Sequence, residues 1–175
     1  MKASLYGAGA EYALHSLLTL ATRSEPVSVR DLAEYQQIPE RFLAQVFARL
    51  VKGGLVTARE GITGGYVLAR SASSITVNDV LEAVDSERLL FSCAEVRRKC
   101  VLYGAEPPAW STNGMCRIHL FMTEAEEALR IFLRSKTLAD LCGELEQKAP
   151  QEFIAASEVW FHQRRTGRIA RRKKL

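Results

Sequence analysis

The sequence predicts a mainly α-helical protein that carries one short two-stranded β-hairpin. Apolar residues recur at intervals of three and four within residues 39–52 and 117–134, which is the period of an amphipathic helix. Between these segments, two short runs of β-forming residues enclose the glycine-containing segment 60–64, which is typical of a hairpin.

Three helices are predicted in the N-terminal third of the chain. The first covers about residues 5–22. A capping-box-like motif that starts at Ser28 begins the second helix, which runs to about Tyr35. Pro39 suits the first turn of the third helix, over about 39–52, and two glycines end it.

The predicted strands cover residues 55–59 and 65–69, and a fourth helix covers about 77–84. Helix, turn, helix and then a hairpin is the order of a winged helix-turn-helix domain, a common DNA-binding unit. We therefore assign residues 1–85 to such a domain with a two-stranded β-wing.

The remaining chain is predicted to form three further parts. Residues 86–116 are irregular and hold three of the four cysteines, and a stretch of this kind is usually functional or disordered. Residues 117–147 contain a long amphipathic helix, suited to dimerisation, and a second helix, which Thr137 caps and which runs to about Glu146. Residues 148–175 form a C-terminal extension, in which a helix after Pro150 precedes a basic tail.

The basic tail explains the positive net charge of +4. Its seven cations are Arg164, Arg165, Arg168, Arg171, Arg172, Lys173 and Lys174. Without them the chain has 17 basic and 20 acidic residues. Such a tail either attracts phosphate independently of sequence or is a disordered, solubilising end.

No membrane partner is expected. No apolar run approaches the roughly 20 residues that span a bilayer. The apolar N-terminal stretch contains Glu11 and His15 and repeats with a helical period, so it is predicted to be a core helix and not a signal peptide. We expect a cytoplasmic protein.

Two groups of residues could hold a metal. Glu11 and His15 are four residues apart, so a helix places them on one face. The other group comprises Cys93, Cys100, Cys116 and His119. Cysteines in a reducing compartment more often serve metal or redox chemistry than structural bridges. For Cys142, on the apolar face of a predicted helix, we expect a place in the core.

Several of these segments resemble a known family. Residues 28–68, with Gly-Gly-Leu-Val at 53–56 and Thr-Gly-Gly-Tyr-Val-Leu at 63–68, resemble the Rrf2 (Rrf-two) family of bacterial regulators. Glu-Tyr-Ala-Leu-His at 11–15 and Phe-Ser-Cys-Ala-Glu-Val-Arg at 91–97 are similar to its RsrR-like redox-sensing branch. The resemblance implies a homodimer that binds near-palindromic double-stranded DNA, and not an enzyme.

The resemblance to the RsrR-like branch also implies a 2Fe–2S cluster. Two cysteines of one subunit would hold it together with a glutamate and a histidine of the other. On this chain the four positions are Cys93, Cys116, Glu11 and His15. Imidazole in place of thiolate raises the potential of such a cluster, which suits a redox sensor.

Other ligand schemes remain open. Cys116 and His119 resemble the Cys-x-x-His of the IscR branch, so a second scheme combines Cys93, Cys100 and Cys116 with His119 or Glu11. A zinc site at Cys100, Cys116 and His119 and a thiol switch between Cys93 and Cys100 or Cys116 are further alternatives.

Two other function classes also remain open. An iron–sulfur enzyme is disfavoured because the sequence has no nucleotide-binding loop and no nucleophile motif. A winged-helix protein-interaction module with structural zinc is the remaining class.

The third helix is expected to enter the major groove of DNA. Its candidate contacts to base edges or phosphates are Arg41, Gln45 and Arg49. The other candidates are Arg30 and Lys52 for phosphates, and Arg59 and Tyr66 in the wing. The IscR branch has an arginine directly before the first wing glycine, where this chain has Glu60 preceded by Arg59.

Overall fold

The computed structural model describes residues 5–85, 90–103 and 105–172. The chain divides into two compact units. The first comprises residues 1–86 and 134–175, and the second comprises residues 87–133.

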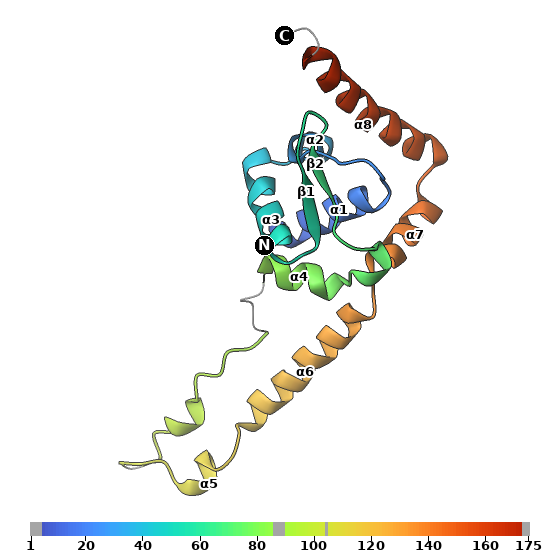
Figure 1. Ribbon diagram of the computed structural model, residues 1–175. Coiled ribbons are helices and arrows are strands. Elements are labelled where there is room, and N and C mark those ends of the chain that lie inside the picture. Colours follow the sequence, from blue (N-terminus) through green and yellow to red (C-terminus); the bar gives the residue numbers. More distant parts are fainter. Residues whose placement is uncertain (1–4, 86–89, 104, 173–175) are drawn as a thin grey trace. The chain divides into compact units, whose positions relative to one another are not determined.

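The first unit starts as a winged helix-turn-helix domain, which confirms the predicted fold class (Figure 1). Its elements are α1 (Ala8–Ala21), α2 (Val29–Gln36), α3 (Glu40–Lys52), β1 (Val56–Arg59), β2 (Gly65–Leu68), the 3-10 helix η1 (Ala72–Ser74) and α4 (Val77–Asp85). The two strands form one antiparallel sheet, in which Val56 is opposite Leu68.

Local signals set the ends of these helices. The Ser28 hydroxyl accepts a hydrogen bond from the Asp31 amide at 3.1 Å and so caps α2, as predicted. Gln37 ends α2 in the left-handed conformation, with φ 54°. Pro39 is the N-cap of α3, one position before the first turn in which it was expected.

The wing is tied to the start of the helix-turn-helix. Val27 and Tyr66 exchange backbone hydrogen bonds of 3.1 and 2.8 Å. A Cβ atom on Gly65 would lie 2.4 Å from the Val27 backbone, so only glycine allows this approach. The wing therefore has a fixed attachment beside the N-terminus of α2.

The core of the first unit is formed mainly by α1, α3 and α4, and Phe47 is its largest fully buried side chain. Helix α7 (Leu138–Lys148) joins this core through Leu138, which is fully buried and donates its amide to the Ile75 carbonyl at 2.9 Å. Thr137 starts α7 with a complete capping box, as the sequence predicted.

Helix α8 (Gln151–Arg172) packs against the same core through Phe161, which is 8% exposed. The Phe161 ring lies 4.8 Å from the Tyr35 ring, and the Arg23 guanidinium lies 4.1 Å from its centre. The helix expected after Pro150 thus continues through the basic residues to Arg172. For this part of the tail, the alternative of a disordered end is wrong.

The second unit contains the 3-10 helix η2 (Val96–Arg98), the short α5 (Ala109–Thr112) and nearly all of α6 (Arg117–Arg134). Helix α6 covers the predicted range and buries none of its residues. Ile118, Phe121, Ile131 and Phe132 are each at least 60% exposed.

Among the described residues, no helix combines the length and the apolar character that a membrane span requires.

We predict that Phe161→Ala lowers the free energy of unfolding by about 2–4 kcal/mol, because it removes a buried aromatic ring and leaves a cavity. Urea denaturation at one protein concentration measures this change. Phe153, on the same helix, is 55% exposed and provides the matched control, for which Phe153→Ala should change stability by about 0.5 kcal/mol or less. Equal effects of the two substitutions would contradict the packing of α8.

Candidate functional site

Helix α1 presents Glu11 and His15 on its outer side. Both residues are exposed, whereas Ala13 and Leu17 on the inner side are fully buried. The spacing of four residues places the carboxylate and the imidazole one turn apart on the same face, as predicted. This pair of donors is therefore accessible on the surface of the first unit.

Cys116 directly precedes α6, at the N-terminal end of that helix. Hydrogen bonds from the backbone amides of His119 and Ile118 lower the pKa of the Cys116 thiol, and the nearby Arg97 guanidinium lowers it further. A low pKa favours the thiolate, which is the form that binds metal and reacts with oxidants.

Cys93 contacts Cys116, and a hydrogen bond between the two side chains also lowers the pKa of Cys116. Arg97 connects the segment around Cys93 with the segment that precedes Cys116. Its Nε donates to Glu95 Oε2 at 3.0 Å, and its Nη2 donates to the Gly114 carbonyl at 2.8 Å. The same Arg97 contact lowers the pKa of Glu95. The structure thus brings together the two cysteines that the family resemblance pairs.

The other predicted donors of the second unit lie differently. Cys100 is exposed. His119 shares with Cys93 a cavity of about 380 Å³, and its ring lies 6.3 Å from that of Phe91. Within the described parts of the chain, no group of three or more His, Cys, Asp or Glu residues could hold a metal ion.

We expected Cys142 to lie in the core. It lies half-buried on α7 and is not fully enclosed. Its side chain lines a cavity of about 360 Å³ together with His15, Tyr35 and Phe153. Burial raises the pKa of the Cys142 thiol, and the charge of Glu146 raises it further. Cys142 is therefore held in the neutral form.

Most of the predicted DNA contacts are exposed. These residues are Arg30 on α2, Arg41, Gln45, Arg49 and Lys52 on α3, and Arg59 on β1. Tyr66 is half-buried, and its ring lies 4.8 Å from the Phe47 ring. Arg49 also donates from Nη1 to the Val84 carbonyl at 2.7 Å, so one of its five donors serves the fold.

Sequence reasoning missed two residues. Arg97 was quoted as part of a motif, but its tethering contact to Gly114 was not foreseen. Arg168 was assigned to the tail, whereas it pairs with Asp31 on α2. Its spacing of three and four residues from Arg165 and Arg164 was the available signal that all three lie on one helical face.

Comparison with known proteins places this arrangement in a family. Residues 6–144 match the sequence profile of Rrf2, described as an iron-dependent transcriptional regulator. This chain belongs to the Rrf2 family. The chain is 35% identical over 162 residues to the HTH-type transcriptional regulator IscR of Klebsiella pneumoniae (strain 342), covering 91% of this chain and 88% of the relative.

Solved structures agree with this assignment. IscR from T. potens matches with a TM-score of 0.62 and 26% identity, covering 86% of this chain and 92% of that chain. A proposed transcriptional regulator from Listeria innocua matches with a TM-score of 0.61 and 26% identity, covering 77% and 83%. The prediction of an Rrf2-family transcriptional regulator, and not an enzyme, is confirmed.

We predict that, in metal-free protein, Cys116 is alkylated by iodoacetamide faster than Cys142 at neutral pH. The pKa of Cys116 is lowered and that of Cys142 is raised, so the Cys116 rate should level off at a lower pH. Peptide mass spectrometry over a pH series measures both rates in one sample. Arg97→Gln should shift the Cys116 profile to higher pH and leave that of Cys142 unchanged. Identical profiles for the two thiols would contradict these shifts.

Proposed function

We propose that the protein is a redox-responsive regulator that binds a 2Fe–2S cluster and near-palindromic DNA as a homodimer. The state of the cluster would set the affinity for DNA. The observation that carries the proposal is the contact between Cys93 and Cys116, with the pKa of Cys116 lowered at the start of α6.

The donor chemistry of this pair fits iron. Iron–sulfur clusters are held mainly by cysteine thiolates, and the environment of Cys116 favours the thiolate. A 2Fe–2S cluster needs four protein ligands, so two cysteines supply half of the set. The family resemblance supplies the other half, a glutamate and a histidine from a second subunit.

Glu11 and His15 suit that role because both are exposed on one side of α1. We assign them, together with Cys93 and Cys116, as the ligands, and we rank the scheme with Cys100 and His119 second. When bound, the cluster would supply one-electron redox chemistry, at a potential that the histidine raises. The chain itself would fix the positions of the ligands. Helix α1 orients Glu11 and His15, and Arg97 connects the segments that carry the two cysteines.

The exposed apolar side of α6 supports the homodimer. Four large apolar side chains at least 60% exposed on one helix are unusual for a surface that stays in water. We propose that residues 117–147 form the dimer contact, which would let one subunit approach the cysteines of the other. Residues 86–116 would form the cluster-binding loop.

The winged domain, residues 1–85, would bind DNA with α3 in the major groove. Arg41, Gln45 and Arg49 would face the groove, whereas Arg30 and Lys52 would contact phosphates. The wing would add Arg59 and Tyr66. Because α1 belongs to this domain, a change at Glu11 and His15 would act directly on the DNA-binding unit. The protein would act in the cytoplasm.

A second candidate follows from the same pair of cysteines. In a cluster-free protein, Cys93 and Cys116 could form a disulfide, losing two electrons and two protons to hydrogen peroxide, which is reduced to two waters. Iron and acid-labile sulfide in protein purified without air favour the cluster. Metal-free protein with a reversible Cys93–Cys116 disulfide favours the thiol switch.

We predict that His15→Ala lowers the iron content of anaerobically purified protein and shifts its visible spectrum, because the cluster loses a ligand. Cys93→Ala and Cys116→Ala should each abolish cluster binding. Cys142→Ala is the matched control, since it removes a cysteine that no ligand scheme uses, and it should keep full iron. A full cluster with an unchanged spectrum in His15→Ala would rule out the proposed ligand set.

We predict that Gln45→Ala and Lys52→Ala affect DNA binding differently. Loss of a base contact at Gln45 should relax sequence preference at one position, at a cost of about 1–3 kcal/mol on the operator. Loss of a phosphate contact at Lys52 should weaken all duplexes alike. Fluorescence anisotropy on operator and random duplexes separates these effects, and equal losses on both duplexes for both variants would contradict the assignment.

A further inference from the structure

A cavity of the first unit, which we name the α1–α8 cavity, is lined by residues of α1, α2, α7 and α8. It is the cavity of about 360 Å³ that Cys142 and His15 line. Its volume lies within the range of small-molecule sites, roughly 300–1,000 Å³. All of its lining residues belong to the first unit, so one compact body forms the whole cavity. The cavity is therefore large enough for a small organic ligand.

The walls of the cavity are mostly apolar. Leu18 of α1, Leu145 of α7, and Phe153 and Ile154 of α8 line it. Leu145 is 48% exposed and Phe153 is 55% exposed. Apolar side chains in this position leave hydrocarbon surface in contact with water, and an apolar ligand would cover that surface. The body of a fitting ligand is therefore apolar.

A cluster of three polar side chains interrupts these apolar walls. Ser157 Oγ accepts hydrogen bonds from Tyr35 Oη at 2.9 Å and from Arg23 Nη2 at 2.6 Å. A hydroxyl has two acceptor lone pairs and one donor, so these bonds leave the Ser157 proton available. In the described parts of the chain, the Ser157 hydroxyl donates to no acceptor. The cluster therefore offers a donor to a ligand in the cavity.

The Arg23 guanidinium adds positive charge to this cluster. Its Nη1 donates to the Thr19 carbonyl at 2.6 Å and to Thr22 Oγ1 at 2.9 Å. Among the described residues, no carboxylate forms an ion pair with Arg23, and its buried Nε has no acceptor. Burial lowers the pKa of Arg23, against smaller opposing effects of Tyr35 and Glu158. A desolvated cation without an ion-pair partner favours a nearby anion.

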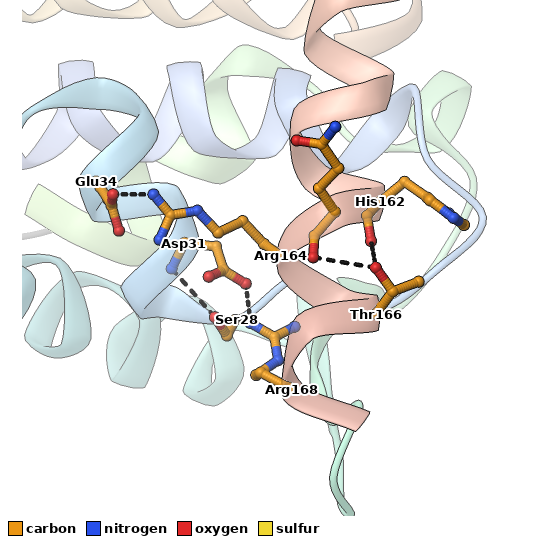
Figure 2. Close-up of polar contacts among 8 residues, drawn as sticks. Ser28, Asp31, Glu34, His162, Arg164, Thr166 and Arg168 are labelled. Carbon is orange, nitrogen blue, oxygen red and sulfur yellow. Dashed lines mark hydrogen bonds and ion pairs between the residues drawn. The ribbon is translucent and has the colours of Figure 1, made fainter. Parts of the chain in front are cut away.

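Two arginines further along α8 differ from Arg23, because each has a carboxylate partner. Arg164 pairs with Glu34, and Arg168 pairs with Asp31 on α2 (Figure 2). These pairs hold α8 against α2, so the wall that α8 contributes to the cavity has a fixed place. The charge of Arg23 is not balanced in the same way.

Two glutamates also line the cavity, and both are exposed. They are Glu146 of α7 and Glu158 of α8. Water and salt screen the charges of exposed carboxylates, whereas a partly buried guanidinium attracts a carboxylate more strongly. The two glutamates therefore disfavour a bound anion less than Arg23 favours it.

We propose that the α1–α8 cavity binds a small apolar monocarboxylate, such as a medium-chain fatty acid. The carboxylate lies against Arg23 and Ser157, where it accepts hydrogen bonds from the guanidinium and the hydroxyl. The hydrocarbon chain lies along Leu18, Leu145 and Ile154.

The position of the cavity allows such a ligand to act on a regulator. His15, a proposed cluster ligand, lines the cavity, and Tyr35 belongs to α2 of the winged domain. A bound acid therefore contacts the DNA-binding domain through α1 and α2, and the C-terminal helices through α7 and α8. This consequence rests on the proposed function, whereas binding of the acid does not.

Isothermal titration calorimetry of the full chain with sodium octanoate tests the proposal, and 1-octanol is the neutral probe of equal chain length. We expect one octanoate per subunit, bound more tightly than octanol. Arg23→Gln should lower the affinity for octanoate about tenfold or more, because charge-assisted hydrogen bonds are lost, and should leave that for octanol nearly unchanged. A merely structural role of Arg23 would weaken the binding of both ligands alike.

Leu145→Glu tests the same cavity without a change at Arg23. The new carboxylate stands at an exposed position in the apolar wall, so the fold should persist while octanoate affinity falls about tenfold or more by repulsion. Val159→Glu is the matched control: Val159 is 54% exposed on α8 and does not line the cavity. This variant should keep the wild-type affinity. Circular dichroism and thermal melting check the fold of all three variants.

The proposal is overturned if wild type binds no octanoate, if octanol binds as tightly, or if the two glutamate variants lose equal affinity. Dissociation of a wild-type oligomer in Leu145→Glu, measured by sedimentation, would also overturn it and assign the cavity to a second copy of the chain. Iron content and operator binding are measured without octanoate. A failure of octanoate binding is therefore distinguishable from a failure of the proposed function.

Discussion

Helix α1 imposes the constraint on which the rest of the proposed mechanism depends. Its inner side, with Ala13 and Leu17 fully buried, is packed into the core of the winged domain. A helix cannot rotate one face without the other, so the outward direction of Glu11 and His15 is fixed by the same packing. Any ligand held by this pair would bear directly on the winged domain, in which α3 is the proposed recognition helix.

Electrostatic pairing connects the same domain to α8, at α2 and the turn that precedes it. The buried carboxylate of Asp31 requires a partner, because an unpaired charge in this position is costly. Arg168 supplies that partner from α8, and the aromatic packing of Phe161 makes the arrangement specific. The winged domain is thus stabilised by its own core and by α8, which lies outside the matched family region 6–144.

The elements that the sequence predicted are those with local signals. The bounds of α6 follow from residue spacing, and the capping box at Thr137 follows from residue type. The pairing of Arg168 with Asp31 links residues 137 apart, so no local pattern contains it. The contact of Cys93 with Cys116 was implied only by the family resemblance, since 22 residues without a long regular element separate them.

The most direct test of the account is a mixed dimer with two differently tagged subunits. One subunit carries Glu11→Ala and His15→Ala, and the other carries Cys93→Ala and Cys116→Ala. If each cluster is held by cysteines of one subunit and by α1 of the other, the mixed dimer regains one intact site. It should then hold about half the iron of wild type, while each variant homodimer holds none. An iron-free mixed dimer would contradict ligation across the dimer.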